Sequence, residues 1–373
     1  MVNKIHKYNF LIVGAGLIGS LLGVHLLQKG YKILVIDKDI SKSKDTRTLA
    51  VNANSKDFLT NLGFWKKLKN KPQKINKIVI KDYINKDPLI FENKDEEMGN
   101  VIFNNELLSI ARQALKTNQS LLEIPTFDLN DLHRNQVIQF NNQKYFFEHI
   151  VLSLGKKFNN DFLIKKYSMN TSHHAFVGFF KHTYSHNQIA YEIFTPNGPL
   201  AVLPSPDKIN KTSTFIYSTK DNLSNSSIIK IIKKNFTITH GKIRIEDTIS
   251  QFPISTHISR EKLNEFILIG DTLRSIHPVA GQGWNLGIKD IQILSDLLEE
   301  HGLKDDELIK RYSSKRVLES FSYLSFTSLI NNIYESRNSL ASLAIKMSYN
   351  TIKNISFFRK TFIRQAMGRL KLI

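Results

Sequence analysis

The chain has 373 residues, 41% hydrophobic and 23% charged, a composition typical of a folded globular protein. It contains no cysteine, which excludes disulfides, thiolate zinc sites and cysteine nucleophiles. Lys and Arg number 52 against 33 Asp and Glu, and the net charge of +19 favours either a polyanionic partner (nucleic acid or an anionic membrane face) or a lysine-rich solvated surface.

The first predicted element is an apolar strand, Phe10–Val13, which runs into the glycine-rich turn GAGLIG at 14–19. A helix closed by Gly30 follows, and then a second apolar strand, Lys32–Ile36, which ends at Asp37. Because glycines interrupt the apolar N-terminal run, we expect neither a targeting segment nor a membrane-spanning helix.

This glycine pattern is typical of a dinucleotide-binding turn. Gly14 permits the tight turn, Gly16 lets the backbone approach a pyrophosphate, and Gly19 lets the helix pack close to the strand. The helix N-terminus then holds the phosphates, and Asp37 accepts hydrogen bonds from an adenosine ribose. The pattern predicts nucleotide binding but does not distinguish NAD from FAD.

The middle of the chain, about 166–264, changes to short strands rich in aromatic and β-branched residues, and a strand near 75–83 is expected to join them. His173 and His174 are adjacent on a strand and face opposite ways, so we expect solvated side chains and no metal site. The aromatic residues either line a substrate pocket or form ordinary core; they are Phe176, Phe179, Phe180, Tyr191 and Phe194.

A second glycine cluster lies in FILIGDTLRSIHPVAGQGWNLGIKD, residues 266–290. A strand here delivers Asp271 to the carboxyl edge of the sheet, where it can bond the hydroxyls of a ribityl chain. The turn at 281–283 brings backbone N–H groups close to a flat ring, and the helix starting near Asn285 points its positive end at a ring that becomes anionic on reduction. A flavin has both the ribityl chain and the ring, so the predicted cofactor is FAD.

Taken together, these motifs resemble the FAD-dependent aromatic-ring hydroxylases, and within them the ubiquinone-biosynthesis hydroxylases that act on polyprenylated phenols. The resemblance covers nearly the whole chain, in the right order. It is carried by GAGLIG, by the D-x-R-x-x-A pattern of Asp45, Arg47 and Ala50, by MGNVIFNNELL, by NGPLAVLP at 197–204, by FPIS at 252–255, by the GD…HPxxGQGxNxGxxD block and by QAMG near the C-terminus.

The resemblance implies an α/β fold, with a Rossmann-like FAD-binding domain, an inserted β-rich substrate domain and a C-terminal helical segment. The expected FAD-binding domain is discontinuous and comprises residues 1–75, 96–165 and 265–335. The expected substrate domain comprises residues 76–95 and 166–264, and basic amphipathic helices occupy residues 336–373.

The implied activity is that of a monooxygenase, which hydroxylates a polyprenylated phenol or quinone intermediate of ubiquinone biosynthesis with FAD, NAD(P)H and O₂. Arg47 and the first helix are expected to hold the pyrophosphate, and Asp271 the ribitol. Gly283 and Asn285 are expected to contact the cofactor. No acid or base is assigned, and His277 is expected to contact the flavin region. The residues expected to frame the isoalloxazine at the reacting centre are Pro278, Gly281, Gln282 and Gly283.

Three departures from the family pattern leave a second interpretation open. Leu154 stands where the family usually has an aspartate that helps to organise FAD and the nicotinamide donor. Thr272–Arg274 form a bulkier and more cationic turn than the usual Ala-Ala-His, and Asn105 stands where arginine is common. The alternative is therefore a catalytically impaired FAD- and lipid-binding accessory protein of the same pathway.

The last segment, from Asn338 onward, contains no Asp or Glu and carries seven Lys and Arg residues, with apolar residues at helical spacing. Such a helix either lies on an anionic bilayer or packs on the FAD domain. A membrane-dissolved substrate favours the bilayer, so we expect a cytoplasmic protein docked on the inner face of the membrane beside other ubiquinone-pathway proteins. Nucleic acid is not expected, because no recognition motif accompanies the charge.

Overall fold

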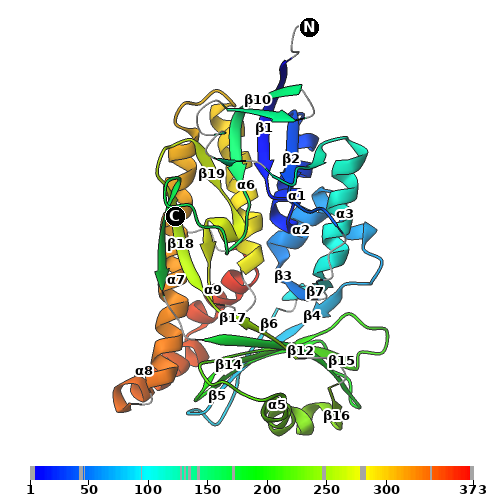
Figure 1. Cartoon of the computed structure of the whole chain (residues 1–373). Coiled ribbons are helices and arrows are strands. Elements are labelled where there is room, and N and C mark those ends of the chain that lie inside the picture. The colour runs from blue at the N-terminus through cyan, green and yellow to red at the C-terminus, as the bar shows by residue number, and fades with distance from the viewer. Residues whose placement is uncertain are drawn as a thin grey trace.

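The computed structural model describes residues 5–369, except 42–44, 46, 94, 127, 130–131, 133–135, 141–142, 170–172, 246–248, 278–282 and 337. Figure 1 shows an upper α/β part, a lower layer formed by a broad sheet, and a long helix, α7, that runs beside both.

The upper part is organised around a six-stranded sheet in the described residues, with the order β19-β10-β1-β2-β8 and β9 paired to β10. All pairs are parallel except that of β9 with β10. The strands are β1 (Ile5–Val13), β2 (Ile33–Asp37), β8 (Leu121–Glu123), β9 (Val137–Phe140), β10 (Gln143–Leu152) and β19 (Phe266–Leu268). The helices of this part are α1 (Leu17–Gln28), α3 (Asn104–Thr117) and α6 (Gly283–His301).

The continuous apolar run at the end of β1 is explained by burial on both faces of the sheet. Phe10 and Ile12 belong to the core cluster that includes side chains of α1, α3 and α6, whereas Leu11 and Val13 belong to the cluster on the opposite face. All four are fully buried. A parallel sheet covered on both sides selects such runs rather than alternating ones.

Two small antiparallel sheets extend the upper part. One has the order β3-β7-β4 and the other β11-β18-β20. Their elements and neighbours are β3 (Thr48–Val51), α2 (Ala53–Asn61), η1 (Trp65–Lys67), β4 (Gln73–Ile75), β7 (Gly99–Phe103), β11 (Ile164–Met169), β18 (Thr256–Glu261), η2 (Gly270–Thr272) and β20 (Arg274–Ser275).

The lower sheet has the order β16-β12-β15-β14-β13-β5-β6, with β17 paired to β12. Its strands are β5 (Lys77–Asp82), β6 (Leu89–Glu92), β12 (His174–His182), β13 (Ile189–Thr195), β14 (Gly198–Pro204), β15 (Thr212–Thr219), β16 (Ile243–Arg244) and β17 (Ser250–Pro253). The segment around 75–83 thus joins this sheet, because β5 pairs in parallel with β13.

One face of the lower sheet is closed by α5 (Asn225–His240) (Figure 1). Phe176, Phe180 and Tyr191 form a core cluster with the buried face of α5. These three aromatic residues are therefore core and do not line a pocket. Phe194 lies apart from that cluster, stacked on Tyr334 of α7 at 4.2 Å between ring centroids.

The chain ends in three consecutive helices, α7 (Leu308–Ser336), α8 (Ser339–Asn354) and α9 (Ser356–Ala366). α9 packs on β6, where the ring of Phe362 stacks on Phe91 at 4.3 Å. In the described part of the chain, every helix is too short or too polar to cross a membrane. The parallel sheet, the inserted β-rich sheet and the helical C-terminus confirm the expected fold class.

Candidate functional site

The residues expected to bind a cofactor gather at one edge of the parallel sheet. Gly14 follows β1, Asp37 ends β2, Leu154 follows β10, and Asp271 follows β19. Since these strands run parallel, their carboxyl ends meet at the same edge, which is where folds of this type bind ligands.

The three glycines of the turn at 14–19 differ in their surroundings. Close packing requires a glycine at two of these positions, and the third has free space around it. Gly14 has φ +111°, and a Cβ there would lie 2.2 Å from the Ser153 carbonyl oxygen; a Cβ on Gly19 would lie 2.0 Å from the Gly14 oxygen. At Gly16 a Cβ would meet nothing within 4 Å. Gly16 is the N-cap of α1 and has no side chain that could accept a hydrogen bond from the first N–H groups of the helix. An open backbone with spare donors is the environment that a pyrophosphate needs.

Two charged residues fix the conformation of this turn. The Asp37 carboxylate accepts a hydrogen bond from the Ala15 N–H at 2.7 Å. Arg112 of α3 donates to the carbonyl oxygens of Ala15 and Ser41, each at 2.8 Å. Sequence reasoning missed Arg112. The available signal was a cation on the face of α3 that also carries Leu108.

Arg47 belongs to the D-x-R-x-x-A motif and contacts Phe252 of the FPIS motif. Its guanidinium bonds Asp45 through two N–H groups, at 2.8 and 2.7 Å, and lies over the ring of Phe252 at 5.7 Å. Asn104 donates to the same carboxylate at 2.6 Å. Because the Arg47 side chain is 58% exposed, its outer face remains open to a further anion such as a phosphate.

Asp271 lies in the η2 turn after β19, with part of its side chain open to solvent. The surrounding protein raises its pKa by desolvation, and the positive charges of Arg274, Lys156 and Arg47 oppose that rise. Asp271 and Arg47 therefore interact electrostatically, although they are distant in sequence. A carboxylate of this kind fits a site that supplies hydroxyl donors from a ribityl chain.

A buried carboxylate, Asp290 of α6, holds the Asp271 turn in place. It accepts hydrogen bonds from the Gly270 N–H at 2.8 Å, from Arg274 at 2.8 Å and from Arg316 of α7 at 2.6 Å. Asp290 and Arg316 are fully buried. Asp290 closes the GxNxGxxD part of the motif, yet no role for it was predicted from the sequence, because its partner Arg316 lies 26 residues away. Arg274, the cation at the position of the family histidine, is thus neutralised by Asp290 within the fold.

Two departures from the family pattern touch each other. The Thr272 hydroxyl accepts hydrogen bonds from the backbone N–H groups of Leu154, at 2.6 Å, and Gly155, at 3.0 Å. The Leu154 side chain packs against the core cluster that contains Leu152 and Leu273. A leucine at this position therefore extends the core.

Two of the expected site residues, Gly283 and Asn285, lie at the start of α6. A Cβ on Gly283 would meet nothing within 4 Å, whereas one on Gly287 would lie 2.6 Å from Ile18 of α1. Asn285 donates to the Ala50 carbonyl oxygen at 2.9 Å and accepts from the Asn52 N–H at 3.2 Å. Its amide therefore ties α6 to β3. Three residues expected to frame the isoalloxazine lie outside the described residues, and they are Pro278, Gly281 and Gln282.

The expectation that His173 is solvated is wrong. It is 5% exposed and its Nε2 lies 2.5 Å from the Glu335 carboxylate of α7, a partner that the sequence did not suggest. His277 is 2% exposed, and burial is the main cause that lowers its pKa to about 4. The described residues contain no group of three or more His, Asp or Glu suited to a metal ion.

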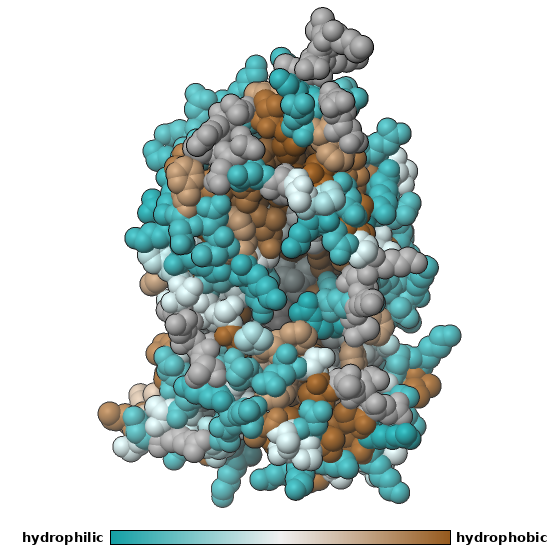
Figure 2. Space-filling model, viewed as in Figure 1, coloured by the Kyte–Doolittle hydropathy of each residue, from teal (hydrophilic) through white to brown (hydrophobic). Residues whose placement is uncertain are grey.

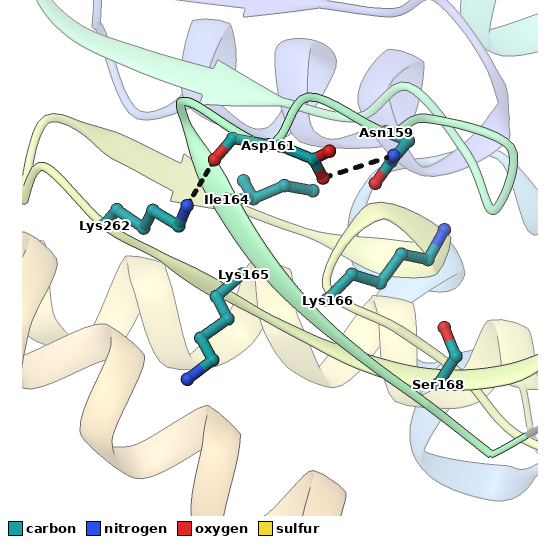
Figure 3. Close-up of a pocket in the computed structure, with 7 residues that line it drawn as sticks. All are labelled: Asn159, Asp161, Ile164, Lys165, Lys166, Ser168 and Lys262. Atoms are coloured by element: carbon teal, nitrogen blue, oxygen red, sulfur yellow. Dashed lines mark hydrogen bonds between the residues drawn. The ribbon is translucent and has the colours of Figure 1, made fainter.

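A separate cavity of about 540 Å³ lies beside β11, away from the glycine turn (Figure 3). Three of its seven lining residues are lysines, and Figure 3 shows Lys262 bonded to Asp161. Lys166 donates to the carbonyl oxygens of Lys156 and Phe158 at 2.8 and 3.1 Å. Ile164 is the single apolar residue of this lining, so the cavity does not suit a flat aromatic ring.

Comparison with solved structures defines the class of the fold. The p-nitrophenol 4-monooxygenase PnpA from Pseudomonas putida aligns with a TM-score of 0.76 at 12% identity, over 98% of this chain and 100% of its own. PqsL, a probable FAD-dependent monooxygenase from Pseudomonas aeruginosa, aligns with a TM-score of 0.69 at 13% identity, over 89% of this chain and 98% of its own. The fold is that of the flavin-dependent monooxygenases.

Sequence comparison then gives the family. The model of the FAD binding domain matches residues 7–131 and 173–324, and the chain belongs to this family. Similar proteins include the ubiquinone hydroxylase UbiL of Rhodospirillum rubrum (25% identity, 97% of this chain, 90% of that protein) and UbiM of Neisseria meningitidis (24%, 96% and 84%). The 3-demethoxyubiquinol 3-hydroxylase of Escherichia coli is 24% identical over 83% of this chain and 85% of its own. The expected kinship with ubiquinone-biosynthesis flavin hydroxylases is confirmed, and FAD is the cofactor.

Proposed function

We propose that this chain hydroxylates the aromatic ring of a polyprenylated phenol or quinone intermediate in ubiquinone biosynthesis, with NAD(P)H as reductant and O₂ as oxidant. The proposal rests on one observation above all. The open Gly16 turn and the Asp271 carboxylate lie at the same edge of the sheet, in a chain whose relatives are named ubiquinone hydroxylases.

Within this site the chain would bind and orient the cofactor, and the flavin, once reduced, would supply the activation of O₂. The α1 N-terminus would hold the pyrophosphate, helped by the outer face of Arg47. Asp37, at the end of β2, would contact the adenosine ribose, and Asp271 would bond the ribitol. Asp290 would support Asp271 indirectly, because its hydrogen bonds hold Gly270 and Arg274, which lie on either side of Asp271 in the sequence.

We also propose that the upper α/β part and the lower sheet serve different functions. Residues 1–75, 96–165 and 265–335 would serve the cofactor, and residues 76–95 and 166–264 would meet the substrate. This division follows the two large sheets, since the parallel sheet contains β1, β2, β10 and β19, and the lower sheet contains β5 and β12. The strand β18 lies within 166–264 but pairs with β11 and β20 in the upper part.

The C-terminal helices support peripheral docking on an anionic membrane. Leu340, Leu343 and Met347 of α8 are 76%, 54% and 62% exposed, so the apolar stripe read from the sequence faces outward, and Ala341 and Ile345 pack inward. Figure 1 shows α8 projecting from the body, and Figure 2 shows apolar side chains at that corner. A polyprenyl substrate dissolved in the membrane would be collected from this side.

A second candidate function is that of an accessory FAD- and lipid-binding protein without turnover. It is favoured by Leu154, which replaces the family aspartate and packs into the core. Purified protein separates the two candidates. In both, the protein carries FAD, but the enzyme alone oxidises NAD(P)H faster when a prenylated phenol is added. Bound FAD without substrate-stimulated oxidation, by either nicotinamide, would favour the accessory protein.

A further inference from the structure

A group of buried polar residues lies where three segments of the chain meet. His173 precedes β12 of the lower sheet, Glu335 lies near the C-terminal end of α7, and His277 lies just before the 278–282 part of the flavin motif. The His173 Nε2 lies 2.5 Å from Glu335, and the rings of His173 and His277 meet edge to face with centroids 5.6 Å apart. This group, His173, His277 and Glu335, is called the histidine site below.

Glu335 fixes the protonation pattern of His173. Burial pushes the pKa of Glu335 upward, but hydrogen bonds from Lys220 and His173 outweigh it and lower the pKa below its ordinary value. The carboxylate is therefore ionised and accepts hydrogen bonds at both oxygens, from Lys220 at 2.6 Å and from His173. Since Nε2 of His173 must carry the proton, Nδ1 is left with a lone pair when the ring is neutral.

Within the described residues, the Nδ1 lone pair of His173 accepts no hydrogen bond. The Nδ1 of His173 is buried and makes no hydrogen bond there, and the same is true of both ring nitrogens of His277. Buried polar atoms in folded proteins normally have partners. His182 in the same sheet illustrates this, because its two nitrogens bond the Tyr184 carbonyl and the Ser213 hydroxyl at 2.6 and 3.0 Å.

The histidine site therefore offers an acceptor nitrogen, backed by a carboxylate, beside a second imidazole that can donate or accept. A carboxylate that orients an imidazole and stabilises its protonated form is the arrangement of a general base. Ring hydroxylation by an electrophilic oxygen needs an electron-rich ring, and a phenol becomes more electron-rich when its O–H proton is removed.

We propose that the histidine site binds the phenolic oxygen of the ring substrate, with His173 Nδ1 as the base and His277 as its neighbouring hydrogen-bond partner. The inference rests on the hydroxylase function proposed above. The phenol O–H bond breaks, an N–H bond forms at Nδ1, and the electron pair stays on oxygen. When the hydroxylated ring carbon loses its hydrogen as a proton to solvent, the ring regains aromaticity and the original oxygen recovers its proton from His173.

His277→Phe tests the site without removing a hydrogen bond of the described residues, because neither ring nitrogen of His277 has a partner there. We expect unchanged FAD content and thermal unfolding, and a fall in hydroxylation kcat/KM of about 100-fold, within the range of general acid–base catalysis. The probe is a phenol with a short isoprenoid tail, and its methyl ether serves as the analogue without an O–H. Wild type should bind the phenol more tightly than the ether, and His277→Phe should lose most of that preference.

His173→Asn and Glu335→Gln complete the test, with His174→Phe, whose side chain follows on the opposite strand face, as the matched control. The control should keep full activity. In wild type, kcat/KM should vary with pH, and His173→Asn, at the residue that faces Glu335 and His277, should flatten that variation. If the variants hydroxylate with wild-type kcat/KM and pH profile, the histidine site is overturned and the hydroxylase function stands. If wild type itself hydroxylates no phenol, the proposed function fails, and this inference fails with it.

Discussion

The Leu154 backbone N–H donates a hydrogen bond of 2.6 Å to the hydroxyl of Thr272, which also accepts one from Gly155. The loop after β10 and the turn after β19 are thereby joined at the sheet edge that serves the cofactor. Both residues depart from the family pattern, and each now has a structural role. Leucine extends the core, and threonine supplies the acceptor that an alanine would lack.

Restoring the family acid should therefore damage the fold. Leu154→Asp places a carboxylate against the cluster of Leu152 and Leu273, and we expect a loss of about 1–3 kcal/mol in the free energy of unfolding. Urea titration measures it, with Leu154→Met as the volume-matched control. A variant as stable as wild type with faster NAD(P)H oxidation would show instead that the missing acid limits reduction.

Asp271→Ala should lose FAD and keep the fold, because the Asp271 side chain is partly open to solvent and Asp290 holds the turn independently. A hydrogen bond to a charged group contributes about 1.5–3 kcal/mol, which corresponds to about 10- to 150-fold weaker FAD binding. Fluorescence titration of the apoprotein gives the dissociation constant, and circular dichroism checks the fold. Unchanged flavin affinity would remove Asp271 from the site.

The buried Asp290 should matter more for stability than any surface pair. Asp290→Ala leaves Arg274 and Arg316 buried without their counter-charge, and we expect about 3–5 kcal/mol of destabilisation. The control is Glu299→Ala, which breaks an exposed pair with Lys29 and should cost at most about 1 kcal/mol. Equal, small effects of both changes on the urea midpoint would contradict the role given to Asp290.

Buried histidines predict acid sensitivity. Burial lowers the pKa of His186, His257 and His277 to about 4 each, below the ordinary value near 6.5. Because the folded state then binds fewer protons than the unfolded state, their contribution to stability is full above pH 6.5 and is lost as pH falls towards about 4. Each histidine can add at most about 1.4 kcal/mol per pH unit to the slope. Unfolding free energies between pH 7.5 and 5 measure it, and a flat profile would contradict the burial.

The tail should bind anionic vesicles through its exposed cations. Arg359 donates to the Ile90 carbonyl oxygen within the fold, so a clean charge reversal uses Lys346, Lys360 and Arg364, each changed to Glu. Each cation near an anionic surface adds about 1 kcal/mol of attraction, and the triple variant should stop cosedimenting at low salt. The matched control reverses Lys230, Lys233 and Lys234 of α5 and keeps the same net charge. Equal cosedimentation of the two triple variants would leave the tail as an ordinary packing element.

The sequence predicted correctly the placement of residues whose position depends on local geometry. The Gly14 and Gly19 spacing, the acid at Asp37 and the block around Asp271 act within a single turn or at a strand end, so neighbouring residues reveal them. Arg316, which bonds Asp290, and Glu335, which bonds His173, lie far along the chain, on α7, and no local periodicity predicts either contact. Solvated and buried histidines also share one sequence pattern, which is why His173 was placed wrongly.

The proposed hydroxylase function requires that this chain insert one atom of oxygen from O₂ into a prenylated phenol. The direct measurement is mass spectrometry of the product made by purified, FAD-loaded protein with NAD(P)H under ¹⁸O₂, with unlabelled water. We expect a hydroxylated product that carries one ¹⁸O atom per ring and whose formation requires the wild-type Gly16 turn, so that Gly16→Val yields none. NAD(P)H consumption by FAD-loaded wild type without any labelled product would contradict the claim.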